Sequence, residues 1–314
     1  MRPPKIFMAS EKKTLFVDGR WLAQPGQGVY TYFHEIYSRI VQRDRPDLEV
    51  IFGLLPGHKP EFLPRNAKVL EYKNDSFLWR QLGLGRAINR LMPDFVHFQY
   101  VLPWGLNPRI HTMVALHDVI FLDHPEFFSR SYRLARKFFF GASARKADSL
   151  LTISDKSARD IHKHFEIPRQ RIEVIPLGAG SRLRHIEPLE VPSLAGCRFL
   201  LTVGRHEPRK NYPRLIEAFV NSRLFETQGT QLVIAGWIAE EFRQSVAAAP
   251  AGVVMLTDCS DQQLAWLFTH AQGFVFPSIA EGYGLPLVEA LEFNLPSATS
   301  ATYPIDAVRD TCVA

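Results

Sequence analysis

Short apolar segments that resemble β-strands alternate with helical segments along almost the whole chain, and this alternation constrains the fold more than any other feature. The apolar runs are rich in Val, Ile and Leu, which is typical of strands that are buried on both faces. Strands separated by helices are joined as βαβ units, and such units form parallel sheets. The sequence therefore predicts an α/β protein with parallel sheets covered by helices.

The segments fall into two groups on either side of residues 179–195, a stretch with several charges that includes Pro188 and Pro192 and that we expect to be a linker. In the first group we expect strands at 14–19, 49–54, 94–98, 111–118, 149–154 and 171–178, and helices at 29–41, 77–92, 128–146 and 155–165. In the second group we expect strands at 198–204, 231–236, 253–256 and 273–278, and helices from 211, at 239–248 and at 261–271. A chain of 314 residues is long enough for two domains, which we place at 1–190 and 191–314.

The charge differs between the two halves. Residues 1–190 contain 29 Lys and Arg and 20 Asp and Glu, whereas residues 191–314 contain 8 and 12. A basic front half indicates an anionic partner, although a solvated basic surface without a partner fits equally well. No recognition motif for nucleic acid accompanies the basic residues.

The sequence also suggests where the protein is found. Its three cysteines have no metal-ligand spacing, which favours inert thiols in a reducing compartment. We find no signal peptide and no apolar run of about 20 residues. We therefore expect a cytoplasmic protein that can touch the inner face of a membrane.

The segment FVFPSIAEGYGLPLVEAL, residues 274–291, changes from a strand to a loop and then to a helix. Gly282 and Gly284 permit positive φ and let a ligand approach the backbone. Pro286 suits the first helical position. The free N–H groups of the first turn, at the positive end of the helix dipole, form an anion site suited to a diphosphate.

Two carboxylates lie on either side of this turn. Glu281 and Glu289 can accept hydrogen bonds from hydroxyl groups at the two ends of a bound diphosphate, as in a nucleotide sugar. An ordinary acid-rich helix start is the alternative interpretation, because acids stabilise helix N-termini.

The segment VGRHEPRKN, residues 203–211, follows another expected strand. Arg205 can bind phosphate oxygens in a bidentate manner, and Lys210 supplies a compact positive charge. We expect Asn211 to cap the next helix. A solvated basic loop is the alternative.

Two further strand ends lie in the first half. Gly26 and Gly28 precede a helix in PGQGVYTY, but Thr31 replaces the last glycine of a dinucleotide fingerprint. His117 and Asp118 end an apolar strand, and either face a ligand or include a structural histidine. A dehydrogenase with two nucleotide-binding domains is disfavoured, since the fingerprint and its following acid are missing.

These segments, in this order, resemble the retaining glycosyltransferases of family 4, with the GT-B fold of two facing Rossmann-like domains. The resemblance covers residues 14–310 and is carried by GQGVYTY, LHD followed by PEFF, LTIS, VGRHEPRKN and EGYGLPLVEA. Members usually continue well beyond the last residues seen here, so the resemblance implies a C-terminally truncated chain with an incomplete second domain. The MLTDCSD segment, 255–261, departs from the family pattern near the nucleobase.

The resemblance implies a role for each candidate residue. Arg205 and Lys210 would bind the donor diphosphate and stabilise the leaving nucleotide, Glu281 would contact the donor sugar, and Glu289 would contact the ribose. Backbone N–H groups of Gly282, Tyr283, Gly284 and Leu285 would lie near the donor, Gly26 and Gly28 would approach its diphosphate, and His117 would face its sugar.

The resemblance implies a hexosyltransferase of cell-surface polysaccharide synthesis, with GDP-mannose as the first candidate donor and a glycan or lipid-linked glycan as acceptor. It implies retention of anomeric configuration without a cofactor or metal, because Arg, Lys and a helix N-terminus replace a cation. A non-catalytic homologue, which binds nucleotide sugar or serves as a subunit of a complex, is the alternative.

The segment FFSRSYRLARKFFFGASARKAD, residues 127–148, combines basic residues with a run of Phe. A core helix with a solvated basic face is the favoured interpretation. Contact with an anionic membrane is the alternative.

Overall fold

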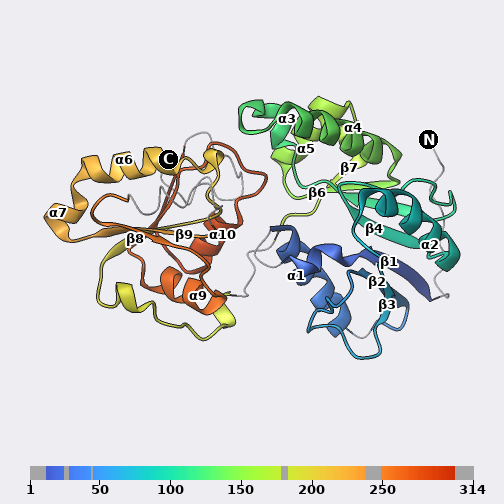
Figure 1. The fold of residues 1–314 in the computed structure, drawn as a ribbon, viewed down its shortest axis with the longest axis horizontal. Helices are drawn as coiled ribbons and strands as arrows, with labels where there is room; N and C mark the ends of the chain where they lie inside the picture. The colour runs from blue at the N-terminus through green and yellow to red at the C-terminus, as the bar shows by residue number, and fades with distance from the viewer. Residues whose placement is uncertain (1–11, 25–27, 44, 178–182, 238–248, 301–314) are drawn as a thin grey trace. The chain divides into compact units, whose positions relative to one another are not determined.

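The structure is a computed structural model that describes residues 12–24, 28–43, 45–177, 183–237 and 249–300. The chain forms two compact units (Figure 1). The first contains Met1–Asp118 and Ser131–Ile175, and the second contains Val119–Arg130 and Pro176–Ala314. The sequence-based boundary between residues 190 and 191 stays a prediction.

The described residues of the first unit form a seven-stranded sheet with the order β3-β2-β1-β4-β5-β6-β7. Every pairing in it is parallel. The strands are β1 (Lys13–Asp18), β2 (Leu48–Leu54), β3 (Lys68–Glu71), β4 (Phe95–Gln99), β5 (His111–Ala115), β6 (Ser149–Thr152) and β7 (Ile172–Val174). The helices of this unit are α1 (Gly28–Gln42), α2 (Leu84–Leu91), α4 (Arg130–Lys146) and α5 (Asp155–Phe165), and its short helical turns are η1 (Gly19–Ala23), η2 (Trp79–Gly83) and η4 (Arg169–Arg171). Helix α3 (Ile120–Asp123) and the turn η3 (Pro125–Phe127) lie in the segment Val119–Arg130, which belongs to the second unit.

The described residues of the second unit form a five-stranded parallel sheet with the order β10-β9-β8-β11-β12. Its strands are β8 (Phe199–Val203), β9 (Gln231–Ala235), β10 (Val253–Leu256), β11 (Gly273–Phe276) and β12 (Ser297–Thr299). Its helices are α6 (Tyr212–Ser222), α7 (Leu224–Gln228), α9 (Asp261–His270) and α10 (Leu285–Glu292), with short turns η5 (Leu183–His185), η6 (Pro192–Leu194) and η7 (Pro208–Lys210). Figure 1 shows α6 and α9 on opposite sides of this sheet. The prediction of an α/β fold with parallel sheets is confirmed.

Three local expectations need correction. The short edge strands β3 and β12 were not expected from the sequence, and three of the four residues of β3 are exposed, so the strand lacks the apolar signal of a buried one. The helix expected from 128 begins at Arg130, because Pro125 starts a separate 3₁₀ turn before it. The helix expected at 239–248 lies outside the described residues.

The stretch that we expected to be a linker contributes to a hydrophobic core. Leu183, Val191 and Leu194 are buried in the same cluster as Phe199 of β8 and Trp266 of α9. Apolar residues are spaced too widely here to predict a helix or strand, yet burying each one stabilises the unit by about 2 kcal/mol. Residues 183–194 therefore pack onto the second sheet.

Among the helices within the described ranges, none is both long and apolar enough to cross a bilayer.

Candidate functional site

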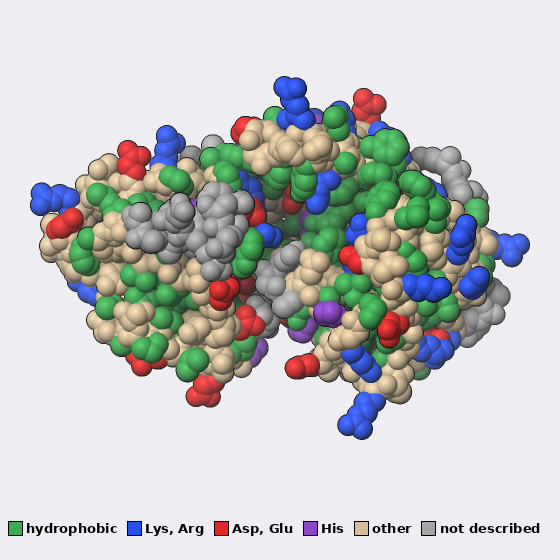
Figure 2. Space-filling view, viewed as in Figure 1, with side chains coloured by type: hydrophobic (Ala, Val, Ile, Leu, Met, Phe, Trp, Pro, Cys, Tyr) green, Lys and Arg blue, Asp and Glu red, His purple; other side chains and the backbone are tan. Residues whose placement is uncertain are grey.

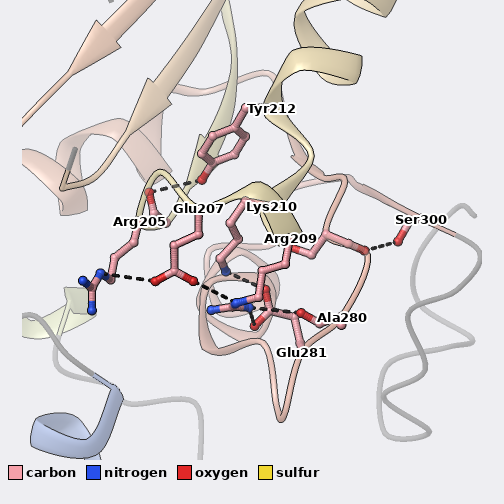
Figure 3. A network of polar contacts seen from close by, with 10 residues as sticks. Arg205, Glu207, Arg209, Lys210, Tyr212, Ala280, Glu281 and Ser300 are labelled. Carbon is pink, nitrogen blue, oxygen red and sulfur yellow. Dashed lines mark hydrogen bonds and ion pairs between the residues drawn. The ribbon is translucent and has the colours of Figure 1, made fainter. Parts of the chain in front are cut away.

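The loops that follow β8 and β11 meet at one edge of the second sheet. The two strands are parallel neighbours, so their carboxyl ends lie together, where open α/β sheets bind ligands. The backbone N–H of Ile279 donates to the carbonyl oxygen of Arg209 at 2.8 Å and fastens one loop to the other. Figure 3 shows the charged side chains that the two loops bring together.

A buried carboxylate lies at the centre of this cluster. Lys210 Nζ donates to Glu281 Oε1 at 2.6 Å, and Arg209 Nη1 lies 2.7 Å from Glu281 Oε2. The same Arg209 nitrogen donates to the carbonyl oxygen of Ala280 at 3.0 Å. Only 5% of Lys210 and 8% of Glu281 are exposed. Both oxygens of the carboxylate are thus paired, as a buried charge requires.

The cluster continues from Arg209 towards solvent. Arg209 Nε donates to Glu207 Oε2 at 2.8 Å, and Glu207 Oε1 lies 3.4 Å from Arg205 Nε. The Arg205 side chain is 45% exposed, and its guanidinium lies 4.9 Å from the ring centroid of Trp237. The five side chains comprise three cations and two carboxylates, so the cluster has a net charge of +1, with an exposed guanidinium suited to an anionic ligand.

The paired charges set the protonation state of Glu281. Burial alone would raise the pKa of this carboxyl, but the positive charges of Lys210 and Arg209 hold the pKa below its usual value. Burial lowers the pKa of Lys210, and the neighbouring Glu281 opposes that shift. Glu281 is therefore ionised at neutral pH and accepts hydrogen bonds.

The loop after Glu281 leads into α10. Gly284 precedes the helix with φ of 83°, a left-handed conformation that favours glycine. Gly282 is not in this region, so positive φ explains only one of the two glycines. Leu285 begins the helix and Pro286 is its second residue, one position later than expected.

The remaining predicted residues of this segment extend along the loop and the helix. The Tyr283 hydroxyl donates to the carbonyl oxygen of Leu177. Glu289 lies in the second turn of α10 and is partly buried. The structure thus brings Lys210 and Glu281 into direct contact, with Arg205 joined to them through Glu207 and Arg209.

The expected helix cap at Asn211 is wrong in its mechanism. Asn211 does precede α6, but its backbone is left-handed, with φ of 57°, and its side chain makes no capping hydrogen bond. An N-cap normally has an extended backbone that directs the side-chain oxygen to the first turn. Here the hydroxyl of Tyr212 donates to the carbonyl oxygen of Gly204 at 3.1 Å and holds the loop.

His117 lies in the first unit, two residues beyond β5. Its side chain is buried, and Nε2 lies 2.6 Å from Oε1 of Gln99. The rings of Tyr32 and Tyr100 pack against it at 4.8 and 5.6 Å. Burial lowers its pKa to about 3, with a smaller contribution from His97. The imidazole is therefore neutral at pH 7. Because Oε1 can only accept, Nε2 carries the proton.

Two further candidates lie in the first half of the chain. Gly28 is exposed and begins α1, and Gly26 lies outside the described residues.

Sequence reasoning missed three members of the cluster: Glu207, Arg209 and Trp237. Arg209 pairs with both carboxylates, whereas the cations predicted from the sequence were Arg205 and Lys210. The sequence carries no signal for this pairing, because only the adjacency of β8 and β11 in the sheet brings Arg209 to Glu281. Trp237 follows β9, and only the neighbouring position of β8 and β9 in the sheet relates it to Arg205.

Family models match both halves of the chain. The model of Glycosyltransferase Family 4 matches residues 21–179, and the model of Glycosyl transferases group 1 matches residues 192–309. The first match covers just over half of the chain. The protein therefore belongs to glycosyltransferase family 4 and is a glycosyltransferase, as the sequence predicted.

The curated relatives include bacterial mannosyltransferases. The chain is 27% identical over 311 residues to O-antigen chain mannosyltransferase B of Escherichia coli, and the match covers 88% of this chain and 79% of that protein. It is 26% identical over 207 residues to the serotype-specific mannosyltransferase WbdA of Escherichia coli, covering 60% of this chain but only 24% of that protein.

Solved structures of low sequence identity share the fold. WaaG, a glycosyltransferase involved in lipopolysaccharide biosynthesis, matches with a TM-score of 0.69 at 20% identity, covering 95% of this chain and 84% of WaaG. HepE of Anabaena, solved with UDP and glucose, matches with a TM-score of 0.64 at 17% identity, covering 93% of this chain and 81% of HepE. The predicted GT-B fold class is confirmed.

Proposed function

We propose that the protein transfers a hexose from a nucleotide diphosphate sugar to a glycan or lipid-linked glycan, with retention of anomeric configuration, in cell-surface polysaccharide synthesis. The observation that carries the proposal is the cluster at the β8–β11 edge, where a buried Lys210–Glu281 pair adjoins the exposed Arg205. Membership of family 4 supports it, and the names of the mannosyltransferase relatives support mannose as the sugar.

The cluster suggests how the donor is held. Arg205 and Lys210 bind the diphosphate, and the N–H groups of residues 282–285 add donors at the start of α10. Glu281 accepts hydrogen bonds from sugar hydroxyls, and Glu289 accepts from the ribose. Contact of Gly26, Gly28 and His117 with the donor, which the family resemblance implies, stays a prediction.

The same residues suggest how transfer proceeds. The bond between the anomeric carbon and the phosphate oxygen breaks while the acceptor oxygen attacks from the same face. The departing phosphate oxygen takes the proton of the acceptor hydroxyl. Arg205 and Lys210 stabilise the negative charge that develops on the diphosphate, a role that needs no metal. Glu281 acts as a positioning residue, which agrees with its ionised state.

GDP-mannose is the first donor to test. HepE was solved with UDP and glucose, which supports a nucleotide sugar as the class of donor but also makes UDP-sugars necessary comparisons. Since lipid-linked acceptors lie in membranes, we place the protein in the cytoplasm, with a peripheral contact to the inner face of the membrane.

A panel of nucleotide sugars tests the proposal. The protein is incubated with each donor, with and without mixed glycan acceptors, and free nucleotide is measured. We expect release of GDP from GDP-mannose that increases with acceptor. Tight donor binding in calorimetry without release of nucleotide would instead support the non-catalytic alternative. If no donor is bound and no nucleotide is released, the assignment is rejected.

A further inference from the structure

A group of large apolar side chains is exposed on the first unit, outside the candidate site. The exposed fractions are 45% for Phe77, 65% for Leu78, 49% for Trp104, 68% for Leu134 and 67% for Phe138. Single exposed apolar residues are normal, whereas a contiguous group marks a surface that binds something. We call these five residues the apolar patch.

Ring contacts make the patch continuous. The ring of Phe77 lies 6.3 Å from that of Trp104 and 5.2 Å from that of Phe139. Phe139 in turn lies 5.2 Å from Phe138. The patch therefore joins three segments: the residues before η2, the loop between β4 and β5, and α4. Figure 2 shows hydrophobic side chains together on the surface in the region of α4.

The backbone beneath the patch is held in place. The N–H of Trp104 donates to the carbonyl oxygen of Gln81 at 2.8 Å, and the N–H of Leu102 donates to Oγ of Ser143 in α4 at 3.0 Å. A Cβ at Gly85 would lie 2.4 Å from the carbonyl oxygen of Trp104, so this loop packs closely on α2. The apolar side chains therefore project from a fixed surface.

Positive charge surrounds the patch. Helix α4 contains six Lys and Arg and no Asp or Glu. One exposed face of α4 carries Leu134, Phe138 and Arg145, because helical residues four and seven positions apart lie on the same side. Lys137 is exposed beside them. Arg86 and Arg90 of α2 are also exposed. Asp75, two residues before Phe77, lies within 3.8 Å of both Arg20 and Arg80, so its charge is compensated.

An anionic bilayer matches both features of this surface. Its interface accepts Trp, Phe and Leu side chains, and its headgroups attract Lys and Arg. Protein interfaces usually have few charged residues at their centres. In a protein complex the basic residues here would lie at the rim, and the partner would need acidic residues opposite them. Helix α4 packs onto the unit through Phe140 and Ala144 but exposes Leu134 and Phe138 among its basic residues. The core helix with a solvated basic face that the sequence favoured therefore describes only part of α4.

We propose that the apolar patch and the basic residues of α4 form a docking surface for bilayers that contain anionic phospholipids. The proposal extends the membrane contact in the proposed function by giving it a site, and it rests on that function only for its biological purpose. The aromatic side chains enter the interfacial region while Lys137 and Arg145 contact headgroups. Docking would hold the enzyme beside a lipid-linked acceptor.

Vesicle co-sedimentation of the full chain tests the proposal without any nucleotide sugar. We expect binding to vesicles with phosphatidylglycerol, weak binding to pure phosphatidylcholine, and release by high salt. Leu134→Ser with Phe138→Ser should lower the partition coefficient at least about tenfold. Lys137→Glu should lower it about fivefold or more. The matched control Leu189→Ser with Val220→Ser, two residues exposed on the second unit, should bind as the wild type does.

Fluorescence gives a second readout. Anionic vesicles with brominated acyl chains should quench tryptophan emission, and Trp104→Phe should remove most of the quenching although four other tryptophans remain. Calorimetric donor binding by the Leu134→Ser, Phe138→Ser variant should equal that of the wild type, so failure of the docking surface and failure of the proposed function are distinguishable. Equal vesicle binding by the wild type and this variant would overturn the proposal. So would a wild type that ignores vesicles and dimerises through the patch in sedimentation equilibrium.

Discussion

At the scale of single residues, Glu281 has the most demanding environment in the cluster. Its carboxylate is almost completely buried, and it is compensated by Lys210 on one oxygen and by Arg209 on the other. A buried ion pair contributes little net stability when intact, but removing one partner leaves a desolvated charge. Glu281 and its two cations therefore hold the two loops in one arrangement.

Replacing this carboxylate should destabilise the protein. We expect Glu281→Gln to lower the free energy of unfolding by about 3 kcal/mol, because Lys210 loses its buried counter-charge. Urea denaturation at neutral pH measures the change. Glu217→Gln, on an exposed position of α6, is the control and should change stability by less than about 0.5 kcal/mol. Equal stabilities for the two variants would show that the pair is not buried as described.

The burial of His117 should make the stability of the protein depend on pH. Burial lowers its folded pKa to about 3, below an unfolded value of about 6.5. The unfolded chain therefore binds the proton first, and stability is lost as the pH falls from about 6.5 towards 3. His97, with a folded pKa lowered by burial to about 4, adds to the loss.

Denaturation at about pH 7 and about pH 5 checks this prediction. His117→Gln should recover about 2 kcal/mol of the stability that the wild type loses between these values. The control His58→Gln, at an exposed position, should lose as much stability between these pH values as the wild type does. An unchanged loss in the His117 variant would contradict the buried, neutral imidazole.

At the scale of elements, the candidate site depends on how closely the loops after adjacent strands approach. Gly236 follows β9 with φ of 148°, and a Cβ there would lie 2.1 Å from the carbonyl oxygen of Gly204. Gly204 begins the loop that carries Arg205. The contact between the two glycines therefore sets the position of this loop.

Adding one carbon at this contact should be costly. We expect Gly236→Ala to destabilise the protein by about 3 kcal/mol, because the Cβ meets backbone that cannot move away. Gly196→Ala is the control, since Gly196 also has positive φ, of 71°, but its Cβ would meet nothing within 4 Å. That variant should lose only about 1 kcal/mol through backbone strain. Thermal and urea denaturation compare the two, and equal losses would mean that space at Gly236 is not limiting.

The sequence predicted the long elements of the fold and most of the motif positions. Buried parallel strands such as β8 have an uninterrupted apolar signal, so their type and location follow from hydrophobicity alone. Exposed edge strands such as β3 have no such signal. The apolar residues of 183–194 were missed because they pack through tertiary contacts and have no regular period.

The candidate site was predictable to the same extent. Arg205, Lys210 and Glu281 follow strands, and that position predicts proximity to a ligand. Their partners were not predictable, because the order of strands decides which loops are neighbours. Because β8 pairs with β11, the loops after these strands are adjacent and Arg209 contacts Ala280 and Glu281. Because β8 also pairs with β9, Trp237 lies against Arg205.

At the scale of the whole molecule, charge is divided between the two halves. The front half is basic and the back half mildly acidic, with 29 cationic against 20 acidic residues before residue 191 and 8 against 12 after it. Within the acidic half, the cluster around Arg209 and Lys210 is locally positive. We propose that this local charge binds the donor diphosphate and that the basic surface of α4 binds anionic lipid.

The central claim is that Arg205 and Lys210 stabilise the leaving nucleotide without a metal ion. Release of GDP from GDP-mannose, measured in EDTA with acceptor, tests it most directly. The wild type should release GDP at the same rate with and without EDTA. Lys210→Ala should be slower at least about a hundredfold, as expected when a group that stabilises developing charge is lost, while Arg214→Ala on the exposed side of α6 keeps the wild-type rate. Thermal denaturation would verify that each variant is folded at the assay temperature. Release that EDTA abolishes and Mg²⁺ restores, or a folded Lys210→Ala protein as fast as the wild type, would contradict the account.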